Sequence, residues 1–309
     1  MLRILFVRIQ YYDNLAVVIL PRIYMKLYYY KDAIGNFGDD LNPIIFNRYF
    51  PDLIDGTAFH GEGIKNYGDS DDLLVGIGTL LNHWIPDKNR KLIFSTGAGY
   101  GISKVLENSE VFCVRGPLTA KKLNLDPSKA ITDGAALLSR MGYPTVPKRF
   151  KYSFIPHYST AINGDWNWVC SMLGVNYIDP CGKAEEIITQ ISETDTVLAE
   201  AMHGAIVADS LRVPWVPVKT SSEILDFKWN DWASGLDMVI EFGTMPSVWK
   251  ASNIFGRLRS GAKKLVALKR MQAILRTEAS MLSRDSTFKD RVDRLEEAAY
   301  LLRSKYRTR

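Results

Sequence analysis

Apolar runs of strand length alternate with apolar stretches of helical period along the chain, and the clearest case surrounds His203. An apolar run at residues 196–199 leads into a polar corner that contains Glu200 and His203. A segment of period 3.6 follows at 205–211, then a strand-like run at 215–218, which together predict strand, turn, helix and strand. The N-terminus of such a helix faces the crevice beyond the strand ends, where anions bind. His203 is expected there, unless it is a helix-start histidine bonded to backbone.

Further apolar runs end in glycine or polar residues, as buried parallel strands do when they feed loops at one edge of a sheet. They lie at residues 25–30, 73–78, 92–101, 111–114 and 152–156. A strand and turn are also expected at 131–138, with Asp133 at the corner. The GAGYG segment at 97–101 is no dinucleotide-binding fingerprint, because no third glycine opens a helix. The pattern predicts an α/β fold of two Rossmann-like domains that face a cleft.

The chain is expected to divide into four parts. Residues 1–24 are interpreted as an upstream extension before a start at Met25, or else as an extra strand or membrane-contacting segment. Residues 25–149 and 150–245 form the two Rossmann-like domains, and 246–309 form a basic amphipathic helical tail.

Polar residues at the predicted strand ends are the candidates for chemistry. Asn36, Gly38, Asp39 and Asp40 follow the first strand, where glycine lets a loop approach a phosphate or sugar and an aspartate can cap the next helix. Arg115 directly follows the strand at 111–114. An arginine there points into the crevice, although a surface arginine beside a turn fits the sequence equally well.

Charge is concentrated in the tail. Residues 250–309 carry 16 Lys and Arg against 6 Asp and Glu, a net charge of +10, which leaves −5 for the rest of a chain whose total is +5. The tail predicts two helices with apolar faces, at 262–282 and 288–302. Folding back across the domain pair is favoured over an interfacial membrane helix. No run of 18 residues is apolar enough to predict a membrane span.

Other classes of protein fit the composition poorly. The 3 cysteines form no ligand cluster with the 4 histidines, so no metal site is expected and a reducing compartment is favoured. Trp229 and Trp232 lack interleaved basic residues, so they are expected to be packing residues and no nucleic-acid partner is predicted.

The chain resembles the polysaccharide pyruvyltransferases, most of all the succinoglycan-type exopolysaccharide ketal transferases. The motifs that carry the resemblance, in order, are NFGDDLNP (36–43), GIGTLL (76–81), STGAGYG (95–101), VRGPLT (114–119), ITDGA (131–135) and AMHGAIVAD (201–209). The resemblance implies a glycosyltransferase-B-like fold, with the acceptor on the first domain and the donor on the second. It implies an enzyme that moves pyruvyl from phosphoenolpyruvate onto two hydroxyls of a sugar, forms a cyclic ketal and releases phosphate, with phosphoenolpyruvate as co-substrate and no further cofactor.

The resemblance also suggests roles for single residues. Arg115 matches an arginine that grips the donor, and His203 matches a histidine that suits a general acid for C3 of phosphoenolpyruvate. Asp39 or Glu200 is the expected base for the sugar hydroxyls. Many relatives place an arginine where this chain has Ala201, so one anion contact must come from elsewhere. The remaining predicted contacts are Gly204, Lys219 and Ser222 for the donor and Asn36, Gly38 and Asp40 for the acceptor, with Arg140, Arg212 and Lys219 as candidates to replace the missing arginine.

Two other functions stay open from the sequence. The first is a nucleotide-sugar glycosyltransferase, because such enzymes have the same fold. The second is a non-catalytic scaffold of a polysaccharide assembly complex, because the arginine of many relatives is missing at Ala201. A lipid-linked saccharide acceptor is implied by the resemblance. The expected location is therefore cytoplasmic, with peripheral contact at the inner face of the plasma membrane through the basic tail.

Overall fold

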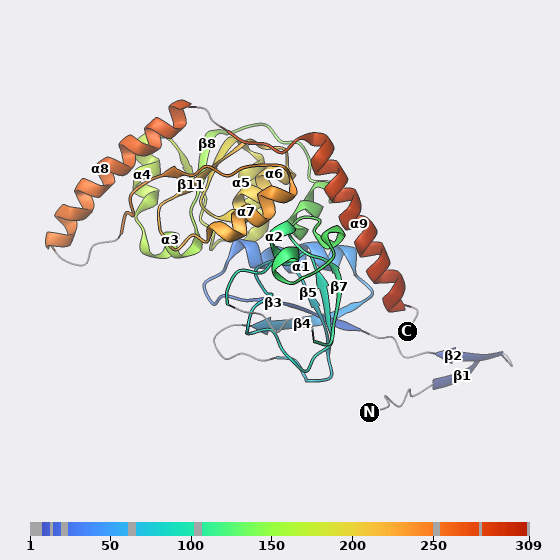
Figure 1. Cartoon of the computed structure of the whole chain (residues 1–309). Helices are drawn as coiled ribbons and strands as arrows, with labels where there is room; N and C mark the ends of the chain where they lie inside the picture. Colours follow the sequence, from blue (N-terminus) through green and yellow to red (C-terminus); the bar gives the residue numbers. More distant parts are fainter. Residues whose placement is uncertain are drawn as a thin grey trace.

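Two five-stranded sheets form the centre of the molecule in the computed structural model (Figure 1). The structure describes residues 8–12, 15–19, 24–60, 66–101, 107–249, 254–277 and 280–307. All neighbouring strands within each five-stranded sheet run parallel, which confirms the predicted α/β fold with two Rossmann-like sheets.

The first sheet is built from residues 25–113 and has the strand order β4-β3-β5-β6-β7. Its strands are β3 (Met25–Tyr30), β4 (Ile54–His60), β5 (Asp72–Val75), β6 (Lys91–Phe94) and β7 (Ser109–Cys113). β5 and β6 are buried along their whole length, as their continuous apolar sequences predict. The chain leaves β3 toward β4 on one side and continues at β5 on the other, so a switch point lies between β3 and β5.

The second sheet repeats this arrangement in the order β12-β11-β10-β8-β9. Its strands are β8 (Phe150–Ile155), β9 (Asn176–Tyr177), β10 (Thr194–Ala199), β11 (Trp215–Lys219) and β12 (Gly243–Thr244). The switch point lies between β8 and β10. We refer to the first sheet with its helices as the first half of the molecule and to the second sheet with its helices as the second half. Ligands of open α/β sheets bind at switch points, so each half offers one side of a cleft.

Helices cover the faces of both sheets. They are α1 (Phe37–Tyr49), α2 (Pro117–Lys122), α3 (Tyr158–Asn163), α4 (Trp166–Leu173), α5 (Ala184–Ser192), α6 (Met202–Ser210), α7 (Asp226–Gly235), α8 (Ile254–Thr277) and α9 (Asp285–Arg307). Two 3₁₀ helices, η1 (Pro127–Lys129) and η2 (Gly134–Arg140), complete the described elements. α6 is the helix predicted after the strand at 196–199.

The strand predicted as part of the strand and turn at 131–138 is not found, because η2 occupies most of this segment, whereas Asp133 does lie at the corner where η2 begins. The side chain of Asp133 accepts a hydrogen bond from the backbone N–H of Ala135 at 3.0 Å, which caps the start of η2. A local aspartate contact therefore favours a helical turn over the extended chain that the apolar residues suggest. The N-terminal segment contains a separate antiparallel pair, β1 (Arg8–Tyr12) with β2 (Leu15–Ile19). The boundaries of the four predicted parts stay a prediction.

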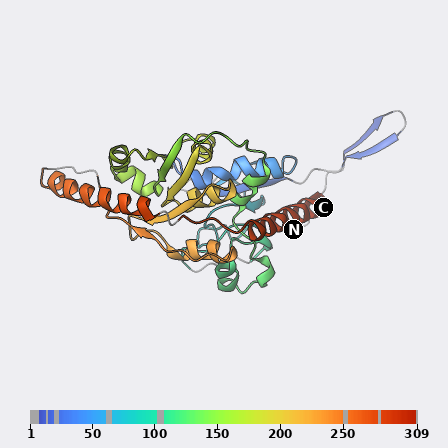
Figure 2. The same cartoon turned by 90° about the horizontal axis from the view of Figure 1, so that it is seen from above.

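The two helices of the tail pack differently and lie at opposite ends of the molecule (Figures 1 and 2). α9 contacts β7 and η2 of the first half, and its apolar face is buried there. α8 packs on α4 of the second half. The predicted folding back therefore holds for the whole apolar face of α9, whereas α8 keeps an exposed face. Within the described residues, no helix combines the length and the apolar character needed to cross a bilayer.

We expect the docking of α9 to stabilise the fold through its buried face. Leu295 is fully buried, whereas Leu301 of the same helix is 47% exposed. Leu295→Ala should lower the free energy of unfolding by about 2–5 kcal/mol, because a cavity replaces the lost side chain. The matched control Leu301→Ala should stay within about 0.5 kcal/mol. Urea denaturation measures both, and equal effects would show that α9 is not docked as described.

Candidate active site

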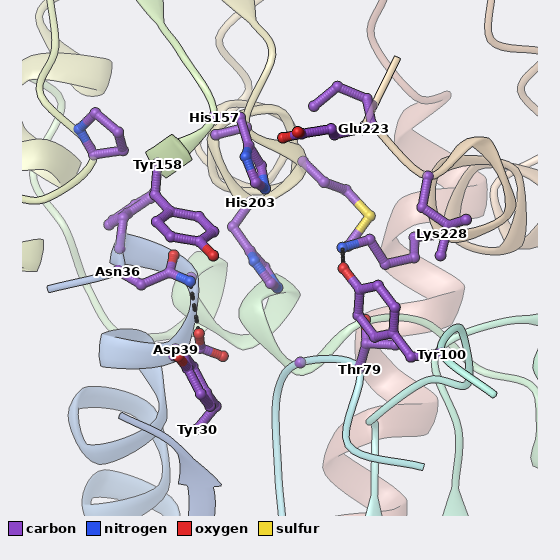
Figure 3. Close-up of a pocket in the computed structure, with 18 of the residues that line it drawn as sticks. Tyr30, Asn36, Asp39, Thr79, Tyr100, His157, Tyr158, His203, Glu223 and Lys228 are labelled. Atoms are coloured by element: carbon purple, nitrogen blue, oxygen red, sulfur yellow. Dashed lines mark hydrogen bonds between the residues drawn. The ribbon is translucent and has the colours of Figure 1, made fainter. Parts of the chain in front are cut away.

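A cavity of about 470 Å³ opens where the two switch points face each other. Figure 3 shows side chains that enter it from both halves of the molecule. The lining includes Tyr30, Asn36, Asp39, Thr79, Asn82, Tyr100, His157, Tyr158, Glu200, His203, Glu223 and Lys228. The cavity is therefore lined both by the segment that follows β3 and by the start of α6, which follows β10. The sequence predicts each of these two segments after its own strand.

His203 approaches the cavity from the first turn of α6 and meets a carboxylate of the first half. Its Nε2 lies 3.6 Å from Oδ2 of Asp133, and both atoms are buried without a hydrogen-bond partner in the described part of the chain. At this distance the two atoms can form an ion pair if His203 is protonated, and a small approach would make a hydrogen bond. Nδ1 lies against Gly38, where an added Cβ would come within 1.9 Å of it, so glycine is needed there.

Asp39 lies on α1 at the wall of the cavity and is 9% exposed. Its Oδ2 accepts a hydrogen bond from Nδ2 of Asn36 at 2.7 Å. Burial raises the pKa of the Asp39 carboxyl to about 8, despite the opposing effect of the Lys228 charge. A carboxyl with a pKa near neutrality can exchange a proton during a reaction, which a carboxyl of ordinary pKa does poorly.

Lys228 is the only Lys or Arg among the described residues that line the cavity. It lies on α7, and its Nζ is 3.0 Å from the hydroxyl of Tyr100 (Figure 3). Burial, together with the Lys228 charge, lowers the pKa of His157 to about 4, so His157 is neutral at pH 7. The Nδ1 atom of His157 hydrogen-bonds Ser159 at 2.8 Å. The described lining thus places the cation of Lys228 beside a neutral imidazole.

The N-terminus of α6 opens into the cavity at Ala201, Met202 and His203. No side chain caps this helix, so its first-turn N–H groups and positive dipole end are directed at any bound ligand. Gly204 lies behind this turn, and an added Cβ would come within 2.5 Å of Ile155. Its role in the structure is therefore close packing of α6 on β8, and Gly204 is not part of the lining.

The sequence is similar to known proteins over most of the two sheets. The sequence model of the polysaccharide pyruvyl transferase family matches residues 6–222. The chain belongs to this family. It is also 40% identical over 218 residues to the succinoglycan biosynthesis protein ExoV of Rhizobium meliloti (strain 1021). That match covers 69% of this chain and 65% of the relative, so the chain spans slightly less than two thirds of the relative's length. The predicted resemblance is confirmed, and membership in a transferase family implies an enzyme.

Arg115, predicted to grip the donor, lies behind the cavity wall of this family member. Its guanidinium is fully buried and pairs with Asp231 of α7 at 3.0 Å, and it also donates to Thr79 Oγ1 at 3.3 Å. Asp231 in turn accepts from the N–H and hydroxyl of Thr119 on α2. Gly97 leaves the space for the guanidinium, since an added Cβ would meet it at 2.2 Å. This placement does not favour direct contact with a donor and favours a role in holding α7.

Glu200 lines the cavity but is fully buried and already accepts three hydrogen bonds. Its Oε1 accepts from the N–H and the hydroxyl of Thr220, and its Oε2 accepts from the N–H of His157 at 3.0 Å. The carboxylate ties together the chain segments that follow β8, β10 and β11. Asp39 is therefore the better placed of the two predicted bases.

Most of the other predicted contacts lie outside the lining. Asp40 accepts from the N–H of Asn36, and Lys219 pairs with Asp226 at 2.6 Å. The candidates for the arginine missing at Ala201 are also engaged elsewhere, since Arg140 pairs with Asp293 and Arg212 with Asp285, and Ser222 does not line the cavity. Asn36 and Gly38, by contrast, both line it.

Sequence reasoning missed several residues of the site, among them Asp133 and Lys228. Asp133 is visible in the sequence as a polar corner, but nothing there links it to His203, 70 positions later. Lys228 lies in a helix that the sequence analysis did not identify, and α7 has no strong apolar period to mark it. Lys228 reaches the cavity, and Asp133 meets His203 beside it, only through the packing of the two halves.

The raised pKa of Asp39 predicts a pH-dependent effect on stability. Between its unfolded value of 3.8 and about 8, the folded protein holds a proton that the unfolded chain has released, so stability falls as pH rises through this window. Asp39→Asn cannot ionise and should have a higher melting temperature than the wild type at pH 9, with a smaller difference at pH 5. Asp87→Asn, at an exposed site, controls for the lost charge. A constant difference across pH would contradict the prediction.

Proposed function

We propose that the protein transfers pyruvyl from phosphoenolpyruvate onto two hydroxyls of a saccharide, forming a cyclic ketal and releasing phosphate. The observation that carries this proposal is the placement of His203 at an uncapped helix N-terminus, beside Asp133, in a cavity that also holds Asp39 and Lys228. This reaction requires a proton donor, an anion site and a group that can accept a proton.

In the proposed reaction, protonated His203 gives its proton to C3 of phosphoenolpyruvate, and C2 becomes electrophilic. Asp133, whose Oδ2 lies 3.6 Å from Nε2, is proposed to hold the imidazolium in place while it gives its proton. The first sugar hydroxyl adds to C2, and Asp39 accepts its proton in the ionised form. The second hydroxyl then displaces phosphate from C2 and gives its own proton to the now neutral His203, which closes the ketal. The proton held by Asp39 leaves with the phosphate or passes to solvent, so both residues return to their starting states.

Lys228 and the first turn of α6 are proposed to hold the phosphate and carboxylate of the donor. Both present positive charge to the cavity, and a helix N-terminus is a general anion site. Lys228 thereby replaces the arginine that is absent at Ala201. The aromatic side chains of Tyr30, Tyr100 and Tyr158 offer apolar faces with hydroxyl groups, which suit a saccharide acceptor.

The protein is proposed to act on a lipid-linked precursor of an exopolysaccharide, at the cytoplasmic face of the membrane. The relationship to a succinoglycan biosynthesis protein supports an exopolysaccharide substrate.

Ligand binding separates this function from its alternatives. Phosphoenolpyruvate should raise the melting temperature, by an amount that corresponds to about 2.7 kcal/mol at 100 times its Kd. Lys228→Gln should weaken this shift, because the cavity loses its cation, whereas Lys121→Gln on the exposed face of α2 should retain it. A shift with UDP-glucose but none with phosphoenolpyruvate would favour a nucleotide-sugar glycosyltransferase, and no shift with either would favour a scaffold.

His203 and Asp133 can be tested by phosphate release with a hexoside acceptor that the wild type turns over. His203→Ala should lower kcat by about 100-fold or more, the usual scale for a lost general acid. Asp133→Asn should lower kcat with little change in the KM for phosphoenolpyruvate, because it removes the carboxylate that faces Nε2 of His203 and does not line the cavity itself. His83→Ala, an exposed histidine outside the lining, is the control. Turnover at the wild-type rate in His203→Ala would remove this residue from the mechanism.

A further inference from the structure

α8 uses one face to pack against the second half of the protein. Ala267 and Met271 are fully buried in a cluster with Trp166, Val169 and Cys170, which all lie on α4. Leu268, Ile274 and Leu275 extend this contact as partly buried residues. The helix is therefore anchored to the body of the molecule along one stripe, and its opposite face is free to meet another partner.

The opposite face of α8 also carries apolar side chains. Leu265 is 60% exposed and Val266 is 49% exposed, and they lie on the side of the helix away from Ala267 and Met271. On the adjoining α4, Trp168 is 37% exposed and Met172 is 59% exposed. Large apolar side chains that stay exposed on two helices packed against each other indicate an interaction surface.

The charge of α8 is entirely positive. Its 24 residues contain no Asp or Glu, and its basic residues are Arg257, Arg259, Lys263, Lys264, Lys269, Arg270 and Arg276. Of the α8 side chains that the structure describes, Lys264 forms the only ion pair, with Asp165, and its Nζ also lies 5.0 Å from the ring of Trp168. α9, by contrast, has acidic residues along its length and pairs several of its basic ones. The two tail helices thus differ in charge as well as in packing.

We propose that α8 and the exposed side chains of α4 form a docking surface for a bilayer that contains anionic phospholipids. This membrane surface consists of Leu265, Val266, Lys269, Arg270, Arg276, Trp168 and Met172. Its apolar side chains enter the boundary between headgroups and acyl chains, its basic side chains contact the phosphates, and tryptophan is well suited to that boundary. A second copy of the chain is disfavoured as the partner, because a symmetric contact would bring identical positive helices together. Figure 1 shows α8 at an outer edge of the molecule, where a flat surface can reach it.

The test is co-sedimentation of the full chain with vesicles of phosphatidylcholine, with and without phosphatidylglycerol. The wild type should bind the anionic vesicles and bind them more weakly at high salt. Lys269→Gln with Arg270→Gln should lower the partition coefficient at least about tenfold, since each basic residue near such a surface contributes about fivefold. Leu265→Ser with Val266→Ser should also lower it. The matched control Lys121→Gln with Lys122→Gln, on exposed positions of α2, should bind like the wild type.

Several outcomes would overturn this inference. They are binding that does not depend on phosphatidylglycerol, equal binding by the Lys269/Arg270 variant and the wild type, and no binding at all. A dimer of the wild type in light scattering that dissociates in the Leu265/Val266 variant would assign the surface to a second copy instead. The inference does not rest on the proposed chemistry, because the shift in melting temperature with phosphoenolpyruvate is measured without vesicles and should persist in every α8 variant.

Discussion

The buried ion pair between Arg115 and Asp231 is the contact on which the arrangement of the cavity depends. Arg115 follows the last strand of the first sheet, Asp231 lies on α7 of the second half, and the two charges meet with no exposure to solvent. Asp231 also caps the start of α2 through Thr119, so α7 is held against the first half by several hydrogen bonds to one carboxylate. Loss of one partner would leave a buried charge uncompensated, at a cost of about 3–5 kcal/mol. This contact places Lys228, three residues before Asp231, in the cavity.

The cavity itself follows from a repeated topology. Each sheet continues from its first strand to both sides, and the loops at the two switch points face each other. The first half supplies Asp39 and Asp133, and the second supplies His157 and His203, so neither half holds the set alone. Burial between the halves is also what raises the pKa of Asp39 and lowers that of His157. The raised pKa of Asp39 and the lowered pKa of His157 are thus consequences of packing the two halves against each other.

The two helices of the tail have similar lengths but make different contacts. α9 buries its apolar face on the first half, and its terminal Tyr306 hydrogen-bonds Asp72 at the start of β5. α8 packs on the second half with one face only and keeps basic and apolar residues on the other. The chain between the two helices is fixed by Asp209, which accepts hydrogen bonds from Ser283. These hydrogen bonds fix the chain between α8, which keeps an exposed face, and α9, whose apolar face is buried.

The sequence by itself determined the local elements of this protein. Continuous apolar runs ending in polar corners predict parallel strands, and they identify His203 and Asp39 at strand ends, because a strand, a turn and a helix follow from neighbouring residues. Only the tertiary structure decided that Arg115 is buried behind the wall, that Asp133 faces His203 and that Lys228 supplies the cation. These placements depend on residues 70 to more than 100 positions apart, and no local pattern encodes which distant side chains meet when two sheets pack.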